Sequence, residues 1–333
     1  MTSRDEELAR LSEAVIRSGS KSFASAARLF DARTRASVHL LYAWCSACDD
    51  AIDGQALGHR PAHAGSTPAG DTLARLRAET QRALEGRASP DPVFQGLQRV
   101  AERHAIPHHH FFELLDGFAM DVAGRSYDTL EETLDYCYHV AGVVGVMMSM
   151  IMGPHDEETL DRAAELGIAF QLTNIARDVI EDARVGRIYL PQRWLDLAGV
   201  PPSDIDAPKF RPALFQVVRR LLAVADTFYD ASVPGIARLP LRAGWAVESA
   251  RIIYREIGRE VVRRGPAAWD QRVTTSPGRK VAAIGQGVLS LARAHTRTSV
   301  PPRPSTSWTR PGARRGTMNE WGEFADARNS GAS

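Results

Sequence analysis

Apolar residues recur every three to four positions along almost the whole chain, which is the spacing of one face of an α-helix. The stretches EELARLSEAVIRSG and DTLARLRAETQRALEG each end at a glycine, where a helix C-cap is expected. The stretches PALFQVVRRLLAVADTFYDAS and LRAGWAVESARIIYREIGREVV have the same period. Neither a series of alternating strands nor an internal repeat is evident, so the sequence predicts an all-α fold.

Two segments depart from this period. Residues 54–71 are rich in Gly, Ala, Pro and His, and we expect a surface loop there. From Thr296 onward the chain has few regularly spaced apolar residues, so residues 296–333 are expected to be a disordered tail. Residues 1–295 are then predicted to form one all-α domain, because a chain with 44% hydrophobic residues has ample material for a core.

The charge totals and the apolar runs exclude several classes of protein. Forty-one Lys and Arg against forty Asp and Glu give a net charge of +1, without the basic excess of a nucleic-acid-binding protein. The N-terminal stretch MTSRDEELARLSEAV is charged and does not resemble a signal peptide. The longest apolar run, Val140 to Gly153, is shorter than the roughly 20 residues that span a bilayer. We expect a buried helix there.

Cysteine and histidine motifs give little evidence of a metal or redox site. Cys45, Cys48 and Cys137 are too few for a disulfide framework, which favours a reducing, cytoplasmic setting. The C-x-x-C of CSAC has neither a βαβ pattern nor a second Cys/His pair beside it. Residues 108–110 are HHH at an expected helix start, and helix-capping or solvated imidazoles are favoured there, because adjacent helical residues do not face the same ion.

The stretch YAWCSACDDAIDG, residues 42–54, places carboxylates on one helical face. Asp49 and Asp53 are four residues apart, so their side chains project from the same side of a helix. Such a like-charge pair costs roughly 0.2–0.5 kcal/mol in an isolated helix. A bound cation would reverse the sign of this interaction.

A second polar stripe lies in FQLTNIARDVIEDARVGRIYLP, residues 170–191. Gln171, Asn174, Asp178 and Asp182 fall at i, i+3, i+7 and i+11, and all carry oxygen atoms. A solvated surface is the simpler interpretation of one such stripe, but two stripes that each continue an apolar sequence weaken it. Oxygen ligands without His or Cys suit Mg²⁺ or Mn²⁺, and Mg²⁺ commonly shares its ligands with substrate phosphate. The implied substrate therefore carries phosphate.

Basic residues near these stripes agree with a phosphorylated substrate. Lys21 lies between Ser20 and Ser22 in GSKSF, Arg177 directly precedes Asp178, and Arg187 follows the second stripe. Lys and Arg side chains can neutralise a departing diphosphate. Each of these residues alone is weak evidence.

The blocks GSKSFASAARLF, YAWCSACDDAID, GFAMDV, YCYHVAGVVG, AFQLTNIARDVIEDARVGRIYLP and YREIG occur in the order seen in squalene and phytoene synthases. The sequence resembles this family over residues 10–310 and is most similar to the bacterial enzymes of carotenoid pathways. The resemblance implies a single-domain isoprenoid-synthase fold, with two aspartate-rich helices at the mouth of a central apolar cavity.

The resemblance also implies a reaction. Two molecules of geranylgeranyl diphosphate would join head to head through prephytoene diphosphate to give 15-cis-phytoene and two diphosphates. The implied cofactor is Mg²⁺ or Mn²⁺, and no NADPH is required. Substrate drawn from a lipid phase implies peripheral membrane contact of a cytoplasmic protein, and downstream carotenoid enzymes are potential partners.

The family motifs transfer to individual positions of this chain. The implied metal ligands are Asp49, Asp53, Asn174, Asp178 and Asp182. The implied catalytic residues are Asp49, Asp53, Asp178, Asp182 and Tyr42. The implied substrate-binding residues are Gly19, Ser20, Lys21, Ser22, Phe23, Tyr42, Ser46, Tyr136, Gln171, Arg177, Tyr254 and Arg272.

An apolar wall is needed because water would quench an allylic cation formed when diphosphate leaves. YCYHVAGVVGVMMSMIMG supplies such a wall, and the rings of Tyr136 and Phe23 could attract a carbocation. Gly142 and Gly145 have two interpretations, either close approach of prenyl chains or tight helix packing.

One position departs from the family, and alternatives stay open. Ser46 stands where relatives usually carry an arginine that binds diphosphate. We therefore expect this chain to bind its substrate more weakly than those relatives. DDAID also fits the D-D-x-x-D signature of head-to-tail prenyl elongases and terpene cyclases. A C30 squalene- or dehydrosqualene-type synthase is a further alternative, as is a catalytically silent member that acts as an assembly protein.

Overall fold

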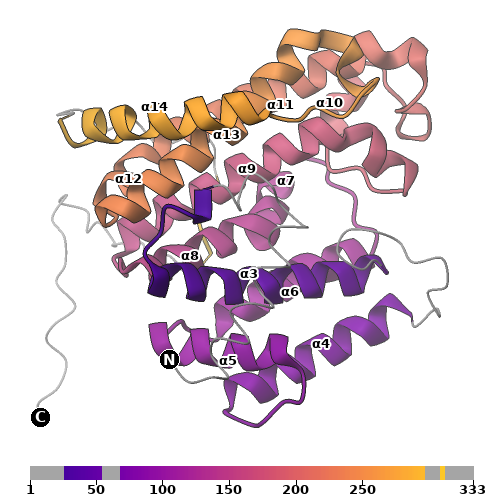
Figure 1. Cartoon of the computed structure of the whole chain (residues 1–333). Helices are drawn as coiled ribbons and strands as arrows, with labels where there is room; N and C mark the ends of the chain where they lie inside the picture. The colour runs from indigo at the N-terminus through magenta and orange to yellow at the C-terminus, as the bar shows by residue number, and fades with distance from the viewer. Residues whose placement is uncertain (1–25, 55–67, 297–307, 312–333) are drawn as a thin grey trace, which may run out of the picture.

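A computed structural model describes residues 26–54, 68–296 and 308–311, and within these ranges every regular element is a helix (Figure 1). The predicted all-α fold is thereby confirmed for this part of the chain. The α-helices are α3 (Ala32–Asp53), α4 (Ala69–Leu84), α5 (Pro92–His104), α6 (His109–Val122), α7 (Leu130–Cys137), α8 (Val143–Met152), α9 (Glu157–Arg184), α10 (Gln192–Leu197), α11 (Arg211–Ala231), α12 (Val233–Arg238), α13 (Leu241–Arg264) and α14 (Pro277–Thr296). The 3₁₀ segments are η2 (Pro202–Asp204), η3 (Pro208–Phe210) and η4 (Gly265–Trp269), and η1 (Tyr138–Gly142) is a π-helix.

Three of the four helices expected from periodicity are present as α4, α11 and α13. The fourth, near the N-terminus, lies outside the described residues. Most of the expected loop at 54–71 also lies outside them, although α4 already begins at Ala69.

Helix α9 is the central element, and α8, α11, α12 and α13 all pack against it. Its first turn is capped by Asp156, whose carboxylate accepts a hydrogen bond from the backbone N–H of Thr159 at 3.0 Å. Its 28 residues make it about 42 Å long, so α9 spans the domain. Figure 1 shows it running through the middle of the helical assembly.

Helix α3 carries the first acidic stretch and is held at both ends. Asp31 caps it by accepting from the backbone N–H groups of Arg33 and Thr34, and it ends at Gly54, whose φ of 61° is the left-handed C-cap conformation. Leu41 and Trp44 are fully buried on the face opposite the exposed surface. These contacts fix the rotation of α3 and hence the direction of its aspartates.

Helices α7, η1 and α8 form one continuous helical stretch, Leu130–Met152. It is 23 residues long, longer than the apolar run alone predicted, and by length and composition it could cross a membrane. However, 67% of its most apolar window is buried inside the domain. This agrees with the expected buried helix.

The contacts of η1 and α8 with α9 are made by main chain. A Cβ atom on Gly145 would lie 2.3 Å from the carbonyl oxygen of Ala163, and one on Gly167 would lie 2.3 Å from that of Ala141. Real Cβ atoms do not approach this closely, so both positions require glycine. The structure therefore supports tight helix packing as the reason for Gly145.

A short C-terminal segment, residues 308–311, packs on the helical domain. Arg310 is buried, donates from Nε to Asp161 at 2.6 Å and also pairs with Glu157. The ring of Trp308 lies 5.7 Å from that of Tyr138. The expectation of a disordered tail over all of 296–333 is wrong for these four residues, because the buried ion pairs attach them to the start of α9. The rest of the expected tail, apart from Thr296 itself, lies outside the described residues.

Candidate active site

A cavity of about 520 Å³ lies between α3, α6, α8, α9, α12 and α13. Most of its wall is apolar, as the predicted central cavity requires, and the polar residues gather where the acidic helices meet. The apolar lining includes Leu114, Phe118, Val140, Val144, Met148, Leu166, Phe170, Ile175, Ile236 and Val247. Such a lining excludes water from the greater part of a long apolar ligand.

The end of the cavity opposite the aspartates is not wholly apolar. Arg162 lines it and donates to Glu165 at 3.2 Å, and both side chains are buried. Arg162 and Asp178 are 16 residues apart on α9, which corresponds to about 24 Å along the helix axis. The cavity therefore runs along most of α9, between an ion pair at one end and the acidic stripe at the other.

On α3, Asp49 faces the cavity, whereas Asp53 lies off its wall and is bound to Arg187. The guanidinium Nη2 of Arg187 donates to Asp53 Oδ1 at 2.6 Å. The pKa of Asp49 is raised to about 7, chiefly because protein surrounds the carboxyl group and next because of the negative charge of Asp53. Asp49 still has an exposed surface, since it borders the cavity mouth.

On α9, the whole predicted stripe lines the cavity. Asn174 donates to Gln171 at 3.3 Å, and Asp178 accepts from Arg177 Nε at 2.7 Å. The pKa of Asp182 is raised to about 7, first by burial and then by the neighbouring Asp178 carboxylate. The helical spacing thus produced the predicted common face.

The other predicted substrate-binding residues divide into three groups. Tyr42, Ser46, Tyr136 and Tyr254 line the cavity. Arg272 is not part of the wall, but its Nη2 donates to Asp178 Oδ2 at 3.1 Å from the segment after η4. Gly19, Ser20, Lys21, Ser22 and Phe23 lie outside the described residues.

A third helix, α6, contributes a further acidic residue to the site, Asp121, which was not predicted. Its carboxylate accepts from the hydroxyl of Tyr189 at 2.8 Å and from that of Tyr136 at 3.1 Å. The two tyrosine rings stack with centroids 4.6 Å apart. Burial raises the pKa of Asp121 despite these hydrogen bonds. The block GFAMDV contained this residue, but a single aspartate after an apolar run gives no spacing from which to assign a role.

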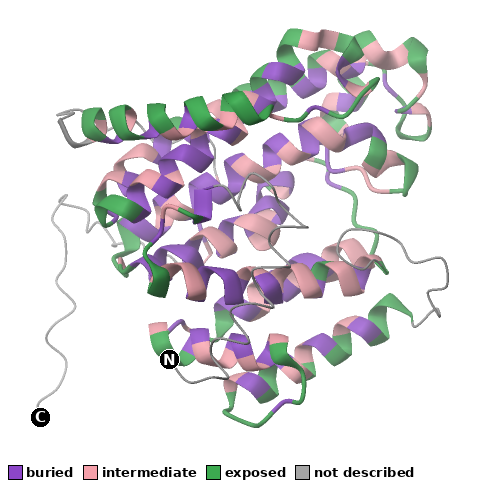
Figure 2. Cartoon of the chain, in the orientation of Figure 1, coloured by how far each residue is buried: buried purple, intermediate pink, exposed green. Residues whose placement is uncertain are grey.

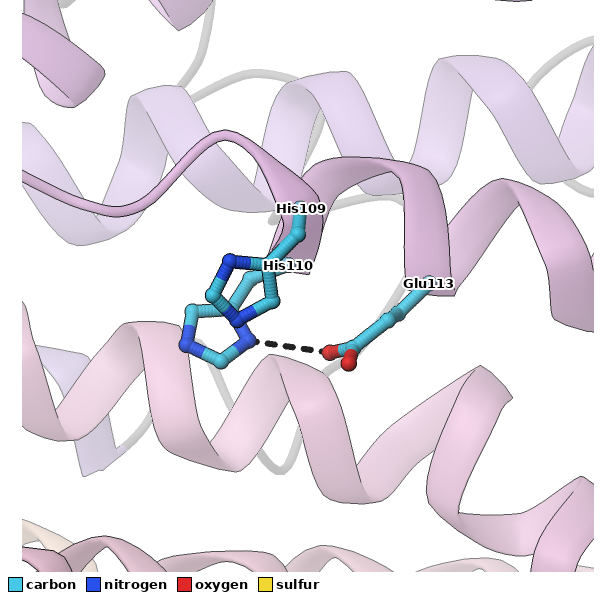
Figure 3. A group of neighbouring side chains, drawn as sticks. All are labelled: His109, His110 and Glu113. Carbon is cyan, nitrogen blue, oxygen red and sulfur yellow. Dashed lines mark hydrogen bonds and ion pairs between the residues drawn. The ribbon is translucent and has the colours of Figure 1, made fainter. Parts of the chain in front are cut away.

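The histidines at the start of α6 form a separate polar cluster (Figure 3). His110 is buried and its Nδ1 lies 2.9 Å from Glu113 Oε2, which also accepts from the hydroxyl of Tyr138 at 2.9 Å. His108 occupies the N-cap position without a side-chain capping bond. His108 and His109 are exposed, as solvated imidazoles would be. The expectation is wrong only for His110, which is part of a buried hydrogen-bonded network with Glu113.

The acidic residues fit a divalent cation of the magnesium type. Asp49, Asp178, Asp182 and Asn174 present only oxygen atoms to the cavity, which is the donor set that Mg²⁺ and Mn²⁺ prefer. Burial and neighbouring carboxylates raise the pKa values of Asp49 and Asp182 even though the charge of Arg187 lowers both, so the protein compensates these two carboxylates only in part. A cation at this place would compensate them.

Two acidic helices across a mainly apolar cavity in an all-α domain define the class of protein. The chain belongs to the squalene/phytoene synthase family, whose sequence profile matches residues 16–279. A phytoene synthase from Pseudescherichia vulneris is 50% identical over 293 residues, covering 88% of this chain and 94% of the relative. A 15-cis-phytoene synthase from Pantoea ananas is 48% identical, with 88% and 94% covered.

Solved structures agree with the predicted isoprenoid-synthase fold. A dehydrosqualene synthase crystal structure superposes with a TM-score of 0.78 at 28% identity, covering 87% of this chain and 98% of that one. A squalene synthase from Alicyclobacillus acidocaldarius has a TM-score of 0.70 at 23% identity, with 80% and 97% covered, and supports the fold alone. The predicted family and fold are thereby confirmed, and with them a prenyltransferase-type enzyme.

Proposed function

We propose that this protein joins two molecules of geranylgeranyl diphosphate head to head, through prephytoene diphosphate, to give 15-cis-phytoene and two diphosphates. The observation that carries the proposal is the pairing of two acidic helical faces at one end of a long, mainly apolar cavity. Relatives about 50% identical over most of the chain, which are phytoene synthases, support this choice of substrate and product.

The proposed metal ligands are Asp49, Asp53, Asn174, Asp178 and Asp182. Bound Mg²⁺ or Mn²⁺ would supply positive charge that favours departure of diphosphate. Asp53 lies at the end of α3, and its carboxylate accepts a hydrogen bond from Arg187. It would bind the metal only after Arg187 is displaced. Arg177, Arg187 and Arg272 lie at the same end and would bind the diphosphate oxygens as they gain charge.

The rest of the cavity would protect the carbocation that remains after diphosphate departure. Tyr136 and Tyr189 stack on one wall, and their hydroxyls are both held by Asp121, which fixes the two rings in place. A fixed aromatic face can stabilise a nearby cation. Phe170 and Tyr254, with ring centroids 4.4 Å apart, line another part of the wall. Phytoene formation ends with loss of a proton, so we propose that no NADPH is needed.

We propose that the protein acts in the cytoplasm at the surface of a membrane, since both substrate and product carry long apolar chains. Enzymes that act on the product are its proposed partners there.

Product analysis tests the proposal directly. Purified protein is incubated with geranylgeranyl or farnesyl diphosphate and Mg²⁺ or Mn²⁺, without NADPH, and the products are analysed by chromatography and mass spectrometry. We expect phytoene from the C20 substrate and none after chelation with EDTA. Preferred formation of a C30 product would indicate a dehydrosqualene-type synthase, a head-to-tail product would indicate an elongase, and a folded but inactive protein would indicate an assembly role.

A further inference from the structure

Helix α14 lies at the outside of the domain, and much of its length is exposed (Figure 2). Val281, Val288 and Leu289 are 70%, 47% and 59% exposed. Together with the exposed Gly285 and Ala292, they recur at helical spacing and cover one arc of α14. The outward face of this helix is thus an apolar stripe, defined here as residues 281, 285, 288, 289 and 292.

The opposite face of α14 packs on α13, so the stripe is not a core face. Leu291 is buried against Gly244 of α13. A Cβ atom added to Gly244 would lie 3.3 Å from the Leu291 side chain. The indole Nε1 of Trp245 donates to the carbonyl oxygen of Ile284 at 2.8 Å. These contacts fix the rotation of α14 and hence the outward direction of the stripe.

The apolar surface continues from α14 onto α13. Leu241, the first residue of α13, is 74% exposed. It precedes Gly244, the contact of Leu291, by one helical turn, so it lies near the C-terminal part of the stripe. Among the described residues, three of the seven exposed large hydrophobic side chains thus lie in the stripe, and Leu241 lies one helical turn from the residue that Leu291 contacts.

The charges of α14 have one sign. The helix contains Arg279, Lys280 and Arg293 and no Asp or Glu. Arg293 is exposed at the edge of the stripe. Arg279 is also exposed, but it donates to two carboxylates of α13, Glu256 at 3.1 Å and Glu260 at 3.4 Å. An apolar stripe edged by cations on an outer helix is the pattern of a helix that lies in a membrane interface.

We propose that the stripe of α14, with Leu241, docks the protein on an anionic lipid surface. Basic residues at the edge of the stripe would meet the lipid headgroups while Val281, Val288 and Leu289 enter the region below them. Helix α13 separates α14 from the cavity, which its residues Val247 and Tyr254 line. Docking would therefore bring the lipid close to the cavity wall. A role of docking in transferring substrate from the lipid to the cavity rests on the proposed reaction, whereas docking itself does not.

Vesicle flotation of the full chain tests the docking surface. The probes are vesicles of phosphatidylcholine alone and of phosphatidylcholine with phosphatidylglycerol. We expect binding to the anionic vesicles that weakens with added salt. Leu289→Glu should lower partitioning about tenfold or more, since it removes the burial of one large apolar side chain. Leu197→Glu is the matched control, because Leu197 on α10 is 82% exposed but lies outside the stripe.

Several outcomes would overturn docking: no binding of the parent protein to anionic vesicles, or equal losses in Leu289→Glu and Leu197→Glu. Conversion of a dimer to a monomer by Leu289→Glu in lipid-free light scattering would assign the stripe to a second copy instead. Should Leu289→Glu lose helical content by circular dichroism, Arg293→Gln replaces it, with weaker binding and a smaller salt dependence expected. An unchanged salt dependence in that variant would contradict the proposal.

Turnover separates this inference from the proposed function. With substrate dissolved in detergent, Leu289→Glu should retain parental activity, whereas with vesicle-borne substrate its rate should fall. Vesicle binding without turnover of any substrate would contradict the proposed condensation of prenyl diphosphates and leave docking intact.

Discussion

The two acidic helices hold their aspartates in different ways. On α9, Asp178 is paired with Arg177, its neighbour in the sequence, and also with Arg272. On α3, Asp53 is paired with Arg187, which is 134 positions away. The acidic stripe of α9 therefore has a cation of its own, whereas that of α3 gains one only when the chain is folded.

The same comparison shows one common feature. In each acidic stripe one aspartate, Asp53 or Asp178, is ion-paired, and the other, Asp49 or Asp182, has its pKa raised to about 7. Charge compensation by the protein is thus incomplete at both stripes. The uncompensated carboxylates are the ones that gain most from a bound cation, and the paired ones need an arginine to be displaced first.

The largest effect is expected from the uncompensated carboxylates. Asp49→Asn and Asp182→Asn should each lower kcat/KM by about 1,000-fold, the order that loss of one charge-stabilising contact costs. Steady-state kinetics with geranylgeranyl diphosphate measures this. Asp116→Asn is the control, since Asp116 of α6 is half-buried, pairs with Arg77 of α4 and is not part of the cavity wall. Near-parental activity in either cavity variant would contradict the metal assignment.

The next largest effect is a difference in the free energy of unfolding between variants of Arg187 and Arg272. Arg187→Met should lower the free energy of unfolding of the metal-free protein by about 1–3 kcal/mol, because it leaves the largely buried Asp53 without its partner. Arg272→Met should cost under about 1 kcal/mol, because Arg272 is 55% exposed and Asp178 keeps Arg177. Urea denaturation in EDTA gives both values. Equal losses would show that the two stripes do not differ as described.

A smaller effect, on kcat/KM, is expected when an arginine is introduced on α3. Ser46 lines the cavity three residues before Asp49, so Ser46→Arg would point a guanidinium at the place of the diphosphate. We expect kcat/KM to rise about tenfold, or about 1.4 kcal/mol. Ser46→Gln controls for side-chain size without charge. An unchanged or lower value in a folded Ser46→Arg variant would mean that Arg177, Arg187 or Arg272 already serves this contact.

The smallest effect is a pH dependence of the metal-free protein. A carboxyl group whose pKa rises from 3.8 to about 7 on folding binds its proton more tightly in the folded state. Its contribution to stability is present at low pH and is lost as the pH rises through 7. We expect Tm in EDTA to fall by about 2–4 °C between pH 6 and pH 8, the size of a change of about 1 kcal/mol.

Calorimetry with Asp182→Asn checks this expectation. The pH dependence should become flatter in that variant, and Mg²⁺ added at pH 8 should raise Tm of the parent more than that of the variant. A Tm that rises from pH 6 to pH 8 in the metal-free parent would contradict the raised pKa values.

The helices and the α9 stripe were predictable because local periodicity determines them. Gln171, Asn174, Asp178 and Asp182 share a face in any α-helix, whatever the rest of the chain does. The cavity wall from α8 followed for the same reason, since its apolar run is longer than a surface helix would show. Family resemblance then supplied Tyr42, Tyr136 and Tyr254, all of which line the cavity.

Contacts between distant segments were not predictable in this way. Asp121 and Tyr189 are 68 positions apart, and Arg310 and Asp161 are 149 apart. No local pattern records which distant residue will meet a given carboxylate, because that depends on how the helices pack. The same holds for His110, whose burial depends on its network with Glu113 and Tyr138.

The main-chain contacts of η1 and α8 with α9 limit how the cavity can be engineered. Gly145 and Gly167 both line the cavity, and neither tolerates a side chain while the two helices keep their separation. The bore of the cavity on this side is therefore set by backbone, and libraries that vary these two glycines would yield mostly unfolded proteins. Met148 and Phe170 line the same wall with large side chains, so they are the positions at which trimming or enlarging a residue can retune which chain lengths fit.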